Sequence, residues 1–163
     1  MSNTTTVSFP TDNSGKIERA VELKNEGNEF FKVGNFKKAK TKYYTALAFT
    51  KGLPGRTNGD SMGKMASKEV YKEDELVSPE QEAFIIEFEA TTKTNIATCF
   101  LKLNDAANAI ECTREALLLK PNGWKAQLRQ AEASIMLHYP ERAVSILDAA
   151  TKNAPIDDVT AHT

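Results

Sequence analysis

The chain has 163 residues and a formal net charge of −1, and its hydrophobic and charged fractions are 40% and 26%. These values are typical of one globular domain with a proper core, and the balanced charge argues against a nucleic-acid partner. The sequence has no secretory segment, no run of about 18 apolar residues, and only two cysteines, Cys99 and Cys112. We therefore expect a cytoplasmic or nuclear protein with reduced thiols and no membrane partner.

Helical spacing of apolar residues begins after a polar stretch, residues 1–15, which we expect to be a loose N-terminal tail. The first helix is predicted from Lys16 to Val33 and the second from about Phe36 to Lys51, separated by the stop signal Gly34-Asn35. Residues 52–77 hold four of the chain's eight glycines and predict a long exposed loop.

The motif Ser78-Pro79-Glu80-Gln81 starts the next helix, with serine as N-cap, proline at the first position and glutamine reaching back. No breaker follows until Asn104, so this helix should be about 25 residues long. Three further helices are predicted over residues 106–120, 124–138 and 141–153. The pattern thus predicts an all-α fold of six helices in three hairpins.

A 34-residue period relates these hairpins. Residues 124–157 align with 90–123 without a gap, and the first hairpin joins the register when the 36 residues 54–89 are removed. Small residues then recur at three places in each hairpin, as Gly27, Ala97 and Ala131, as Ala39, Ala109 and Ala143, and as Ala46, Ala116 and Ala150. We expect them where helices cross, because a larger side chain would separate the helices.

This pattern of small residues, aromatics and a closing proline resembles the tetratricopeptide repeat (TPR) family over residues 20–157, apart from the insertion 54–89. It is carried by Gly27-Phe30-Ala39-Tyr43-Ala46, by Ala97-Phe100-Ala109-Ala116-Pro121 and by Ala131-Ala143-Ala150-Pro155. The resemblance implies three TPR hairpins stacked in a right-handed superhelix, with repeats at about 20–53, 90–123 and 124–157. The TPR domain would span 16–157, followed by a C-terminal tail, 158–163. Ala106 and Ser134 depart from the pattern, since an aromatic residue is usual at both positions.

The first helix of each TPR hairpin would line a concave groove, and each contributes polar residues to it. These residues are Lys24, Asn28 and Phe31, then Asn95 and Thr98, then Lys125, Arg129 and Glu132. Cations and amide donors in one groove suit carboxylate ligands, although Glu132 would take Arg129 in part. One Lys-x-x-x-Asn pair alone is ordinarily a solvated face, so the inference depends on the joint occurrence.

Five of these positions are similar, residue by residue, to the dicarboxylate clamp of chaperone-binding TPR domains: Lys24, Asn28, Asn95, Lys125 and Arg129. The resemblance implies binding of the acidic Glu-Glu-Val-Asp C-terminus of cytosolic heat-shock chaperones, of the seventy- and ninety-kilodalton classes. Lys24, Asn28 and Asn95 would hold the terminal carboxylate. Lys125 would hold the last aspartate side chain, and Arg129 would support the peptide.

The insertion 54–89 is similar in place to the lengthened first hairpin of immunophilin-type co-chaperones. Its position after ALAFTKGLP is also similar to that in the small TPR proteins called tetratricopeptide repeat protein nine. It is either a tolerated surface insertion or a second binding site. After Pro155 the chain is too short for the extra helix that usually covers the last hairpin, which would leave Val144 and Leu147 open to self-association or to a partner.

No catalytic set accompanies these features. His138 and His162 have no nucleophile or metal ligand near them in sequence, and NGDSMGKM lacks the glycine and hydroxyl residue of a phosphate loop. Cys99 and Cys112 are expected to be buried and unreactive. We therefore expect a peptide-binding adaptor without enzymatic activity or a cofactor. The alternative is a structural TPR subunit that assembles a complex through its insertion or its uncovered last helix.

Overall fold

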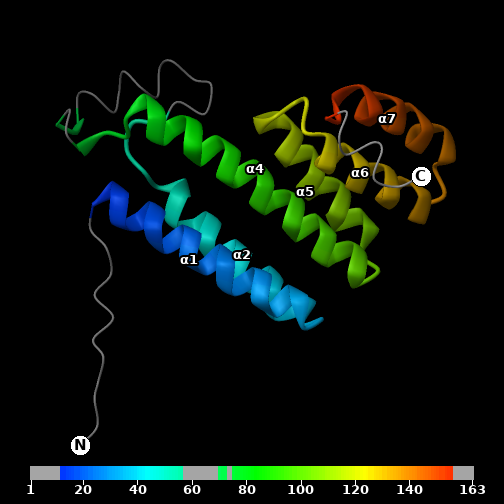
Figure 1. The fold of residues 1–163 in the computed structure, drawn as a ribbon, viewed down its shortest axis with the longest axis horizontal. Helices are drawn as coiled ribbons and strands as arrows, with labels where there is room; N and C mark the ends of the chain where they lie inside the picture. The colour runs from blue at the N-terminus through cyan, green and yellow to red at the C-terminus, as the bar shows by residue number, and fades with distance from the viewer. Residues whose placement is uncertain (1–11, 57–69, 73–74, 156–163) are drawn as a thin grey trace, which may run out of the picture.

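The computed structural model describes residues 12–56, 70–72 and 75–155 (Figure 1). The helices in these ranges are α1 (Asn13–Lys32), α2 (Phe36–Lys51), α4 (Pro79–Lys102), α5 (Ala106–Leu119), α6 (Trp124–Met136) and α7 (Pro140–Asn153). No strand occurs in the part of the chain that is described, and none of its helices has both the length and the apolarity to cross a membrane. The predicted all-α class is confirmed.

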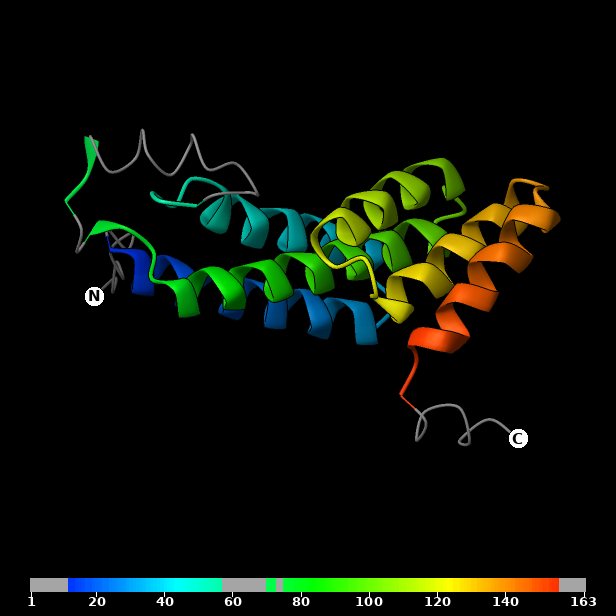
Figure 2. The same cartoon turned by 90° about the horizontal axis from the view of Figure 1, so that it is seen from above.

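Consecutive helices pair into three hairpins, α1–α2, α4–α5 and α6–α7. The hairpins stack through α2 against α4 and through α5 against α6, whereas α1 and α4 touch far less. Figure 2 shows α2 and α5 together on one side of α1 and α4. The first helices of the hairpins are thereby left to border the opposite face, and a groove between them becomes available.

The three hairpins close with the same left-handed turn. The second residue after each first helix has a positive φ, which is 76° at Gly34, 57° at Asn104 and 62° at His138. In each turn the next backbone N–H donates at 2.9 Å to a helical carbonyl, from Asn35 to Phe30, from Asp105 to Phe100 and from Tyr139 to Ser134. Such bonds satisfy carbonyls that the helix end leaves free. The predicted 34-residue register is therefore repeated in the backbone.

The recurrent small residues are all buried, as the register predicted. Gly27 has the tightest surroundings, because a Cβ there would lie 2.6 Å from Cε1 of Tyr43. That distance is far below a normal contact, so only glycine lets the Tyr43 ring cross α1 at this height. The helix-propensity cost of Gly27, about 1 kcal/mol, is offset by this packing.

Two helix starts show how local capping sets the boundaries. The Asp12 side chain accepts from the Gly15 N–H at 3.3 Å, so α1 begins at Asn13 rather than at Lys16, and residues 13–15 belong to the helix rather than to a tail. At α4 the predicted capping box is confirmed. The Gln81 N–H donates to Ser78 Oγ at 3.2 Å, and the Ser78 N–H donates to Gln81 Oε1 at 3.0 Å.

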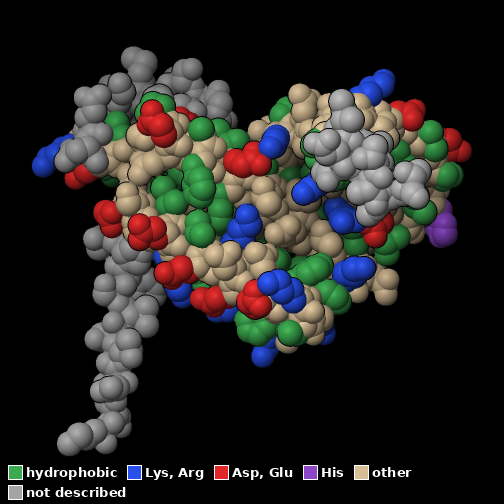
Figure 3. All heavy atoms as spheres, viewed as in Figure 1, with side chains coloured by type: hydrophobic (Ala, Val, Ile, Leu, Met, Phe, Trp, Pro, Cys, Tyr) green, Lys and Arg blue, Asp and Glu red, His purple; other side chains and the backbone are tan. Residues whose placement is uncertain are grey.

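The two ends of the insertion pack against the body of the domain. Leu53, Val77 and Ile85 form a buried cluster against Ile17 of α1, and Phe88 joins a second cluster with residues of α1 and α2. The prediction of an exposed loop over 52–77 is therefore wrong at both ends, because apolar side chains there extend the α1–α4 contact. Residues 57–69 lie outside the described ranges. Figure 3 shows further hydrophobic side chains at the surface beside the N-terminal half of α4.

A buried ion pair ties the start of the insertion to α4. Arg56 Nη1 and Nη2 donate to Glu89 Oε1 and Oε2 at 2.7 and 2.8 Å, and the side chains are only 6% and 10% exposed. Thr50 Oγ1 also donates to Glu89 Oε1 at 2.6 Å, while Arg56 Nη1 donates to the Thr50 carbonyl at 3.0 Å. Every one of these partners is charged or hydrogen-bonded, which a buried pair requires.

Replacing Arg56 with methionine should lower the free energy of unfolding by about 3–5 kcal/mol, because the Glu89 carboxylate would stay buried without its charged partner. The double variant Arg56→Met/Glu89→Gln should recover part of this loss, since the remaining amide carries no charge. Urea unfolding followed by far-ultraviolet circular dichroism measures both changes.

Arg114→Met is the matched control, because Arg114 forms a 2.7 Å pair with Glu111 that is exposed to solvent. Its unfolding midpoint should equal that of the wild type. If Arg56→Met unfolds at the same urea concentration as Arg114→Met, the buried pair does not stabilise the insertion.

Candidate functional site

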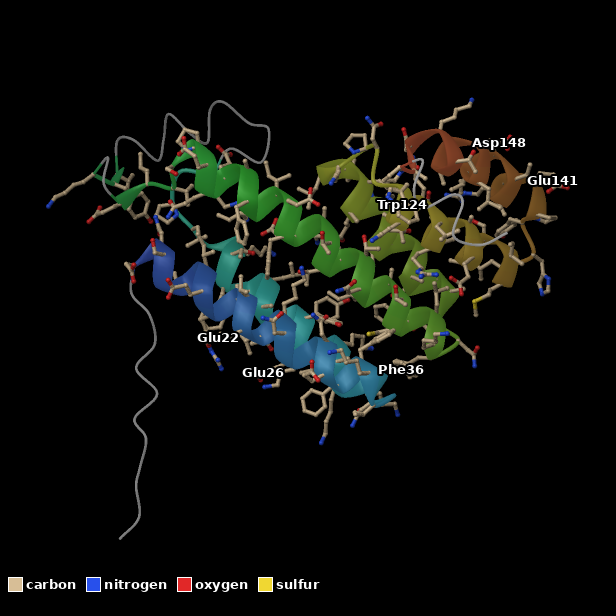
Figure 4. All side chains as sticks on the ribbon, viewed as in Figure 1. Glu22, Glu26, Phe36, Trp124, Glu141 and Asp148 are labelled. Carbon is tan, nitrogen blue, oxygen red and sulfur yellow. The ribbon has the colours of Figure 1, made fainter. Side chains whose placement is uncertain are left out.

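A hollow of about 510 Å³ opens between α1, α4 and α6. Five of the eight predicted groove residues line it, namely Asn28, Phe31, Asn95, Thr98 and Arg129. Figure 3 shows lysine and arginine side chains across the middle of this face, whereas acidic side chains gather along the outer edge of α1. Figure 4 places two of these acids, Glu22 and Glu26, on the side of α1 away from α4. The hollow is therefore bordered mainly by amide and cationic groups, with Glu29 as the acid among its lining residues.

A second hollow of about 300 Å³ lies between α4 and α6 and contains Lys125. Its other lining residues include Thr91 and Trp124, and Asn95 borders both hollows. Trp124 lies at the start of α6 (Figure 4), and the Lys125 Nζ is 5.2 Å from the centroid of its ring. The ammonium of Lys125 thus rests on an aromatic face, a weak contact that a carboxylate can replace.

Lys24 lines neither hollow. Its Nζ is 5.1 Å from the ring centroid of Phe88 on α4, and the side chain is half-buried. Burial lowers the pKa of Lys24, and the nearby Glu87 carboxylate raises it by less. Among the described residues, no carboxylate forms an ion pair with either Lys24 or Lys125. Both ammonium groups therefore rest on aromatic rings without a direct ion pair.

Arg129 and Lys32, two other cations at the larger hollow, each form an ion pair with a glutamate of their own helix. Arg129 Nη1 lies 2.9 Å from Glu132 Oε2, as the sequence suggested, so Glu132 acts on the site through Arg129 without lining the hollow. Lys32, which the sequence analysis missed, also lines the hollow and lies 2.7 Å from Glu29 Oε1. The sequence could have indicated Lys32 as a groove residue, because it continues the four-residue spacing of Lys24 and Asn28. Exposed pairs of this kind are weak, so an incoming anion can exchange with them.

Tyr43 of α2 forms the floor of the larger hollow. Its side chain is 1% exposed, and its hydroxyl donates to Asn28 Oδ1 at 2.8 Å. Burial raises the pKa of Tyr43 to about 12, and a hydrogen bond with the Asn95 side chain lowers this pKa by less. The sequence analysis assigned Tyr43 to the core alone, because the repeat register does not show that its hydroxyl reaches the groove.

The two cysteines are free thiols. Cys99 is buried, which raises its pKa to about 11. Cys112 was predicted to be buried but is only half-buried, because it lies at the α2–α5 surface with its Sγ 3.8 Å from Tyr44 Oη. Partial burial raises the pKa of Cys112 as well. A thiol with a raised pKa is a poor nucleophile.

Across the described ranges no three histidine, cysteine or acidic side chains gather as metal ligands. His162 and NGDSMGKM lie outside those ranges.

Taken together, the site presents amide N–H, guanidinium and ammonium groups along one face, together with one carboxylate in each hollow, Glu29 and Glu87. Asn28 and Asn95 offer donors that carry no charge, while Arg129, Lys32 and Lys125 add positive charge around them. Such a set binds carboxylates through charge-assisted hydrogen bonds. The two hollows meet at Asn95, so two carboxylates of one extended ligand could be bound on either side of it.

No protein-family model matches the sequence. Among solved structures, the C-terminal TPR-containing domain of a Plasmodium falciparum protein assigned as FK506-binding is similar, with a TM-score of 0.67 and 24% identity over 88% of this chain and 82% of that chain. The second TPR domain of Spaghetti (RPAP3), solved with the HSP90 peptide SRMEEVD bound, gives a TM-score of 0.61 and 20% identity over 88% of this chain and 92% of that chain.

These likenesses show the fold of the chain. Its three helical hairpins form a TPR stack, with the insertion between the first and second hairpins. The fold expected from the 34-residue register is therefore confirmed.

The ammonium of Lys24 should titrate below the ordinary lysine value of 10.5, because it is half-buried. Glu87→Gln should lower this pKa further, since it removes the carboxylate that favours the charged form. Carbon-13 NMR of the lysine Cε resonances across a pH series measures the change. Glu22→Gln, on the outer edge of α1, should leave the Lys24 titration in place; an equal shift in both variants would contradict the assigned surroundings of Lys24.

Proposed function

We propose that this protein is a TPR adaptor that binds the acidic Glu-Glu-Val-Asp tail of cytosolic heat-shock chaperones through a carboxylate clamp. One observation carries the proposal: Asn28, Asn95 and Arg129 line a single hollow, although they lie on three different helices. Lys125 reaches the adjoining hollow, which Asn95 also borders. Such convergence is what recognition of a short anionic peptide requires.

Within this proposal each residue has a role. Asn28 and Asn95 donate N–H groups to the terminal carboxylate, and Lys24 swings from the Phe88 ring to supply positive charge. Lys125 leaves the Trp124 ring to bind the last aspartate side chain. Arg129 supports the peptide beyond it, with Phe31 and Thr98 as the walls of the groove. Glu132 competes with the peptide for Arg129.

The second solved structure supports the partner class. The peptide bound to that TPR domain, SRMEEVD, ends in the same four residues as the tail proposed here. At 20% identity the likeness itself concerns the fold, so the donor set on the groove of this chain carries the assignment. We extend the proposal to tails of both the seventy- and ninety-kilodalton classes, because both would present the same terminal carboxylates.

The mechanism is capture without chemistry. Two to three charge-assisted bonds to each carboxylate, offset by the ordering of a flexible peptide, should give roughly micromolar affinity. Such binding suits exchange among partners in the cytoplasm or nucleus, where we place the protein.

Within the TPR fold, the position of the insertion after ALAFTKGLP favours a likeness to the small proteins called tetratricopeptide repeat protein nine.

A second candidate function is assembly of a complex through the last hairpin. Ile135, Tyr139 and Val144 are 56%, 55% and 59% exposed there, which is unusual for large apolar side chains. Self-association through this hairpin would cover them. Sedimentation at high micromolar concentration separates the candidates, because a clean monomer excludes self-association while leaving tail capture unaffected.

Calorimetric titration with a free-carboxylate Glu-Glu-Val-Asp peptide should give roughly micromolar binding, which should weaken steeply with added salt. Lys125→Glu should weaken it by about 10- to 100-fold, because one charge-assisted bond becomes a repulsion. Lys51→Glu is the matched control, since Lys51 is exposed at the end of α2 away from both hollows.

Wild-type protein that fails to bind the free-carboxylate peptide would exclude the clamp. Equal weakening by Lys51→Glu and Lys125→Glu would mean that the overall charge, rather than the assigned groove, attracts the peptide.

Glu132→Gln should strengthen peptide binding by about two- to fivefold, because it removes the acid that competes for Arg129 and costs only an exposed ion pair. Fluorescence anisotropy with a labelled peptide is sensitive enough for this change. Glu111→Gln removes a comparable exposed pair on α5 and should have no effect. Weaker binding by Glu132→Gln would show that Glu132 holds Arg129 in position for the peptide instead of competing with it.

A further inference from the structure

The hydroxyl of Tyr43 reaches the candidate site from below. Tyr43 belongs to α2, the second helix of its hairpin, and no other residue of α2 lines the larger hollow. Its ring is buried among residues of the main core, yet its side chain also borders the larger hollow beside Asn28 and Asn95. The hydroxyl donates to Asn28 Oδ1 at 2.8 Å. It is therefore the point where the core touches the donor groups of the clamp.

Gly27 makes this approach possible. A Cβ at residue 27 would lie 2.6 Å from Cε1 and 2.8 Å from Cδ1 of the Tyr43 ring. Any side chain at that position would displace the ring from beneath α1, and its hydroxyl would move with it. Gly27 directly precedes Asn28, so the same helical turn that admits the ring also presents the amide that the hydroxyl contacts.

The direction of this hydrogen bond decides what Asn28 can offer a ligand. A side-chain amide has one acceptor oxygen and two N–H donors, and it can rotate to present either. Because the buried Tyr43 hydroxyl donates to Oδ1, the oxygen is turned toward the floor and the two N–H groups remain for the hollow. Burial also keeps the pKa of Tyr43 near 12, so the hydroxyl stays protonated and remains a donor at neutral pH.

We propose that Tyr43 is a positioning residue that fixes the Asn28 amide as a donor, so that the site selects a terminal carboxylate over a terminal carboxamide. A carboxylate offers only acceptors and suits this presentation. A carboxamide brings N–H groups of its own, which would meet further donors and lose their hydrogen bonds to water. Such unpaired polar groups give strong discrimination. The inference rests on the function proposed above and names how the site distinguishes its ligand.

The test compares two peptides, Glu-Glu-Val-Asp with a free carboxyl terminus and the same peptide amidated, on the wild type and on Tyr43→Phe. The variant keeps the ring in the space beside Gly27 and removes only the hydroxyl. Binding of the free acid should weaken about tenfold, and the ratio of the two affinities should fall by a similar factor, because the freed Asn28 amide can turn its oxygen toward the carboxamide. A purely structural role for Tyr43 would weaken both peptides equally and leave the ratio unchanged.

Tyr44→Phe is the matched control. Tyr44 is the next residue of α2, but it is exposed and its hydroxyl lies near Cys112, on the far side of the helix from the hollow. It should leave both affinities at their wild-type values. In NMR spectra, the Asn28 side-chain amide resonances should move in Tyr43→Phe and stay in place in Tyr44→Phe, which gives a readout without any ligand.

The outcomes are distinguishable. If the wild type binds the free acid and Tyr43→Phe keeps the wild-type ratio, or the Asn28 amide resonances do not move, the positioning role is overturned while the clamp stands. If the wild type binds neither peptide, the clamp itself is overturned, and the selectivity assigned to Tyr43 falls with it.

Discussion

The close approach of α1 and α2 at Gly27 is the contact on which the candidate site depends. With no side chain at this position, the Tyr43 ring packs directly beneath α1, where a Cβ would lie 2.6 Å away. The same small-residue packing recurs at the helix crossings of the next two hairpins, where the equivalent alanines are buried. Because backbones approach closely at each crossing, the first helices stay aligned and their polar residues meet in one groove.

The charged groups divide into two kinds with different roles. Arg56 and Glu89 are buried, form two hydrogen bonds with each other, and join the insertion to α4, which makes them structural. Around the hollows the pairs are exposed, and Lys24 and Lys125 rest on aromatic rings. Exposed pairs and cation–π contacts are weak. The groove therefore keeps its cations available, whereas the insertion is held by an interaction that does not exchange.

The insertion is closer to the candidate site than its length and composition suggested. Phe88, on which Lys24 rests, and Glu87, whose carboxylate raises the Lys24 pKa, both belong to its last turn on α4. The same turn carries Glu89, the partner of Arg56. The added turns of α4 therefore both extend the contact with the first hairpin and shape the surroundings of Lys24, a link that a surface loop could not provide.

The sequence by itself determined the repeats, since the small residues, the turn signals and the Ser78 capping box are local features whose spacing follows helical geometry. It also indicated the polar line through Asn28, Asn95 and Arg129, because all three lie on the first helix of a hairpin and these helices border one groove. Only the tertiary structure decided which of these groups meet. Lys24 lies on Phe88, Lys32 joins the hollow, Arg56 pairs with Glu89, and the Tyr43 hydroxyl reaches Asn28. Each of these contacts joins different helices or distant segments, or depends on a side-chain rotamer. Neither periodicity nor propensity specifies which side chains come into contact in this way.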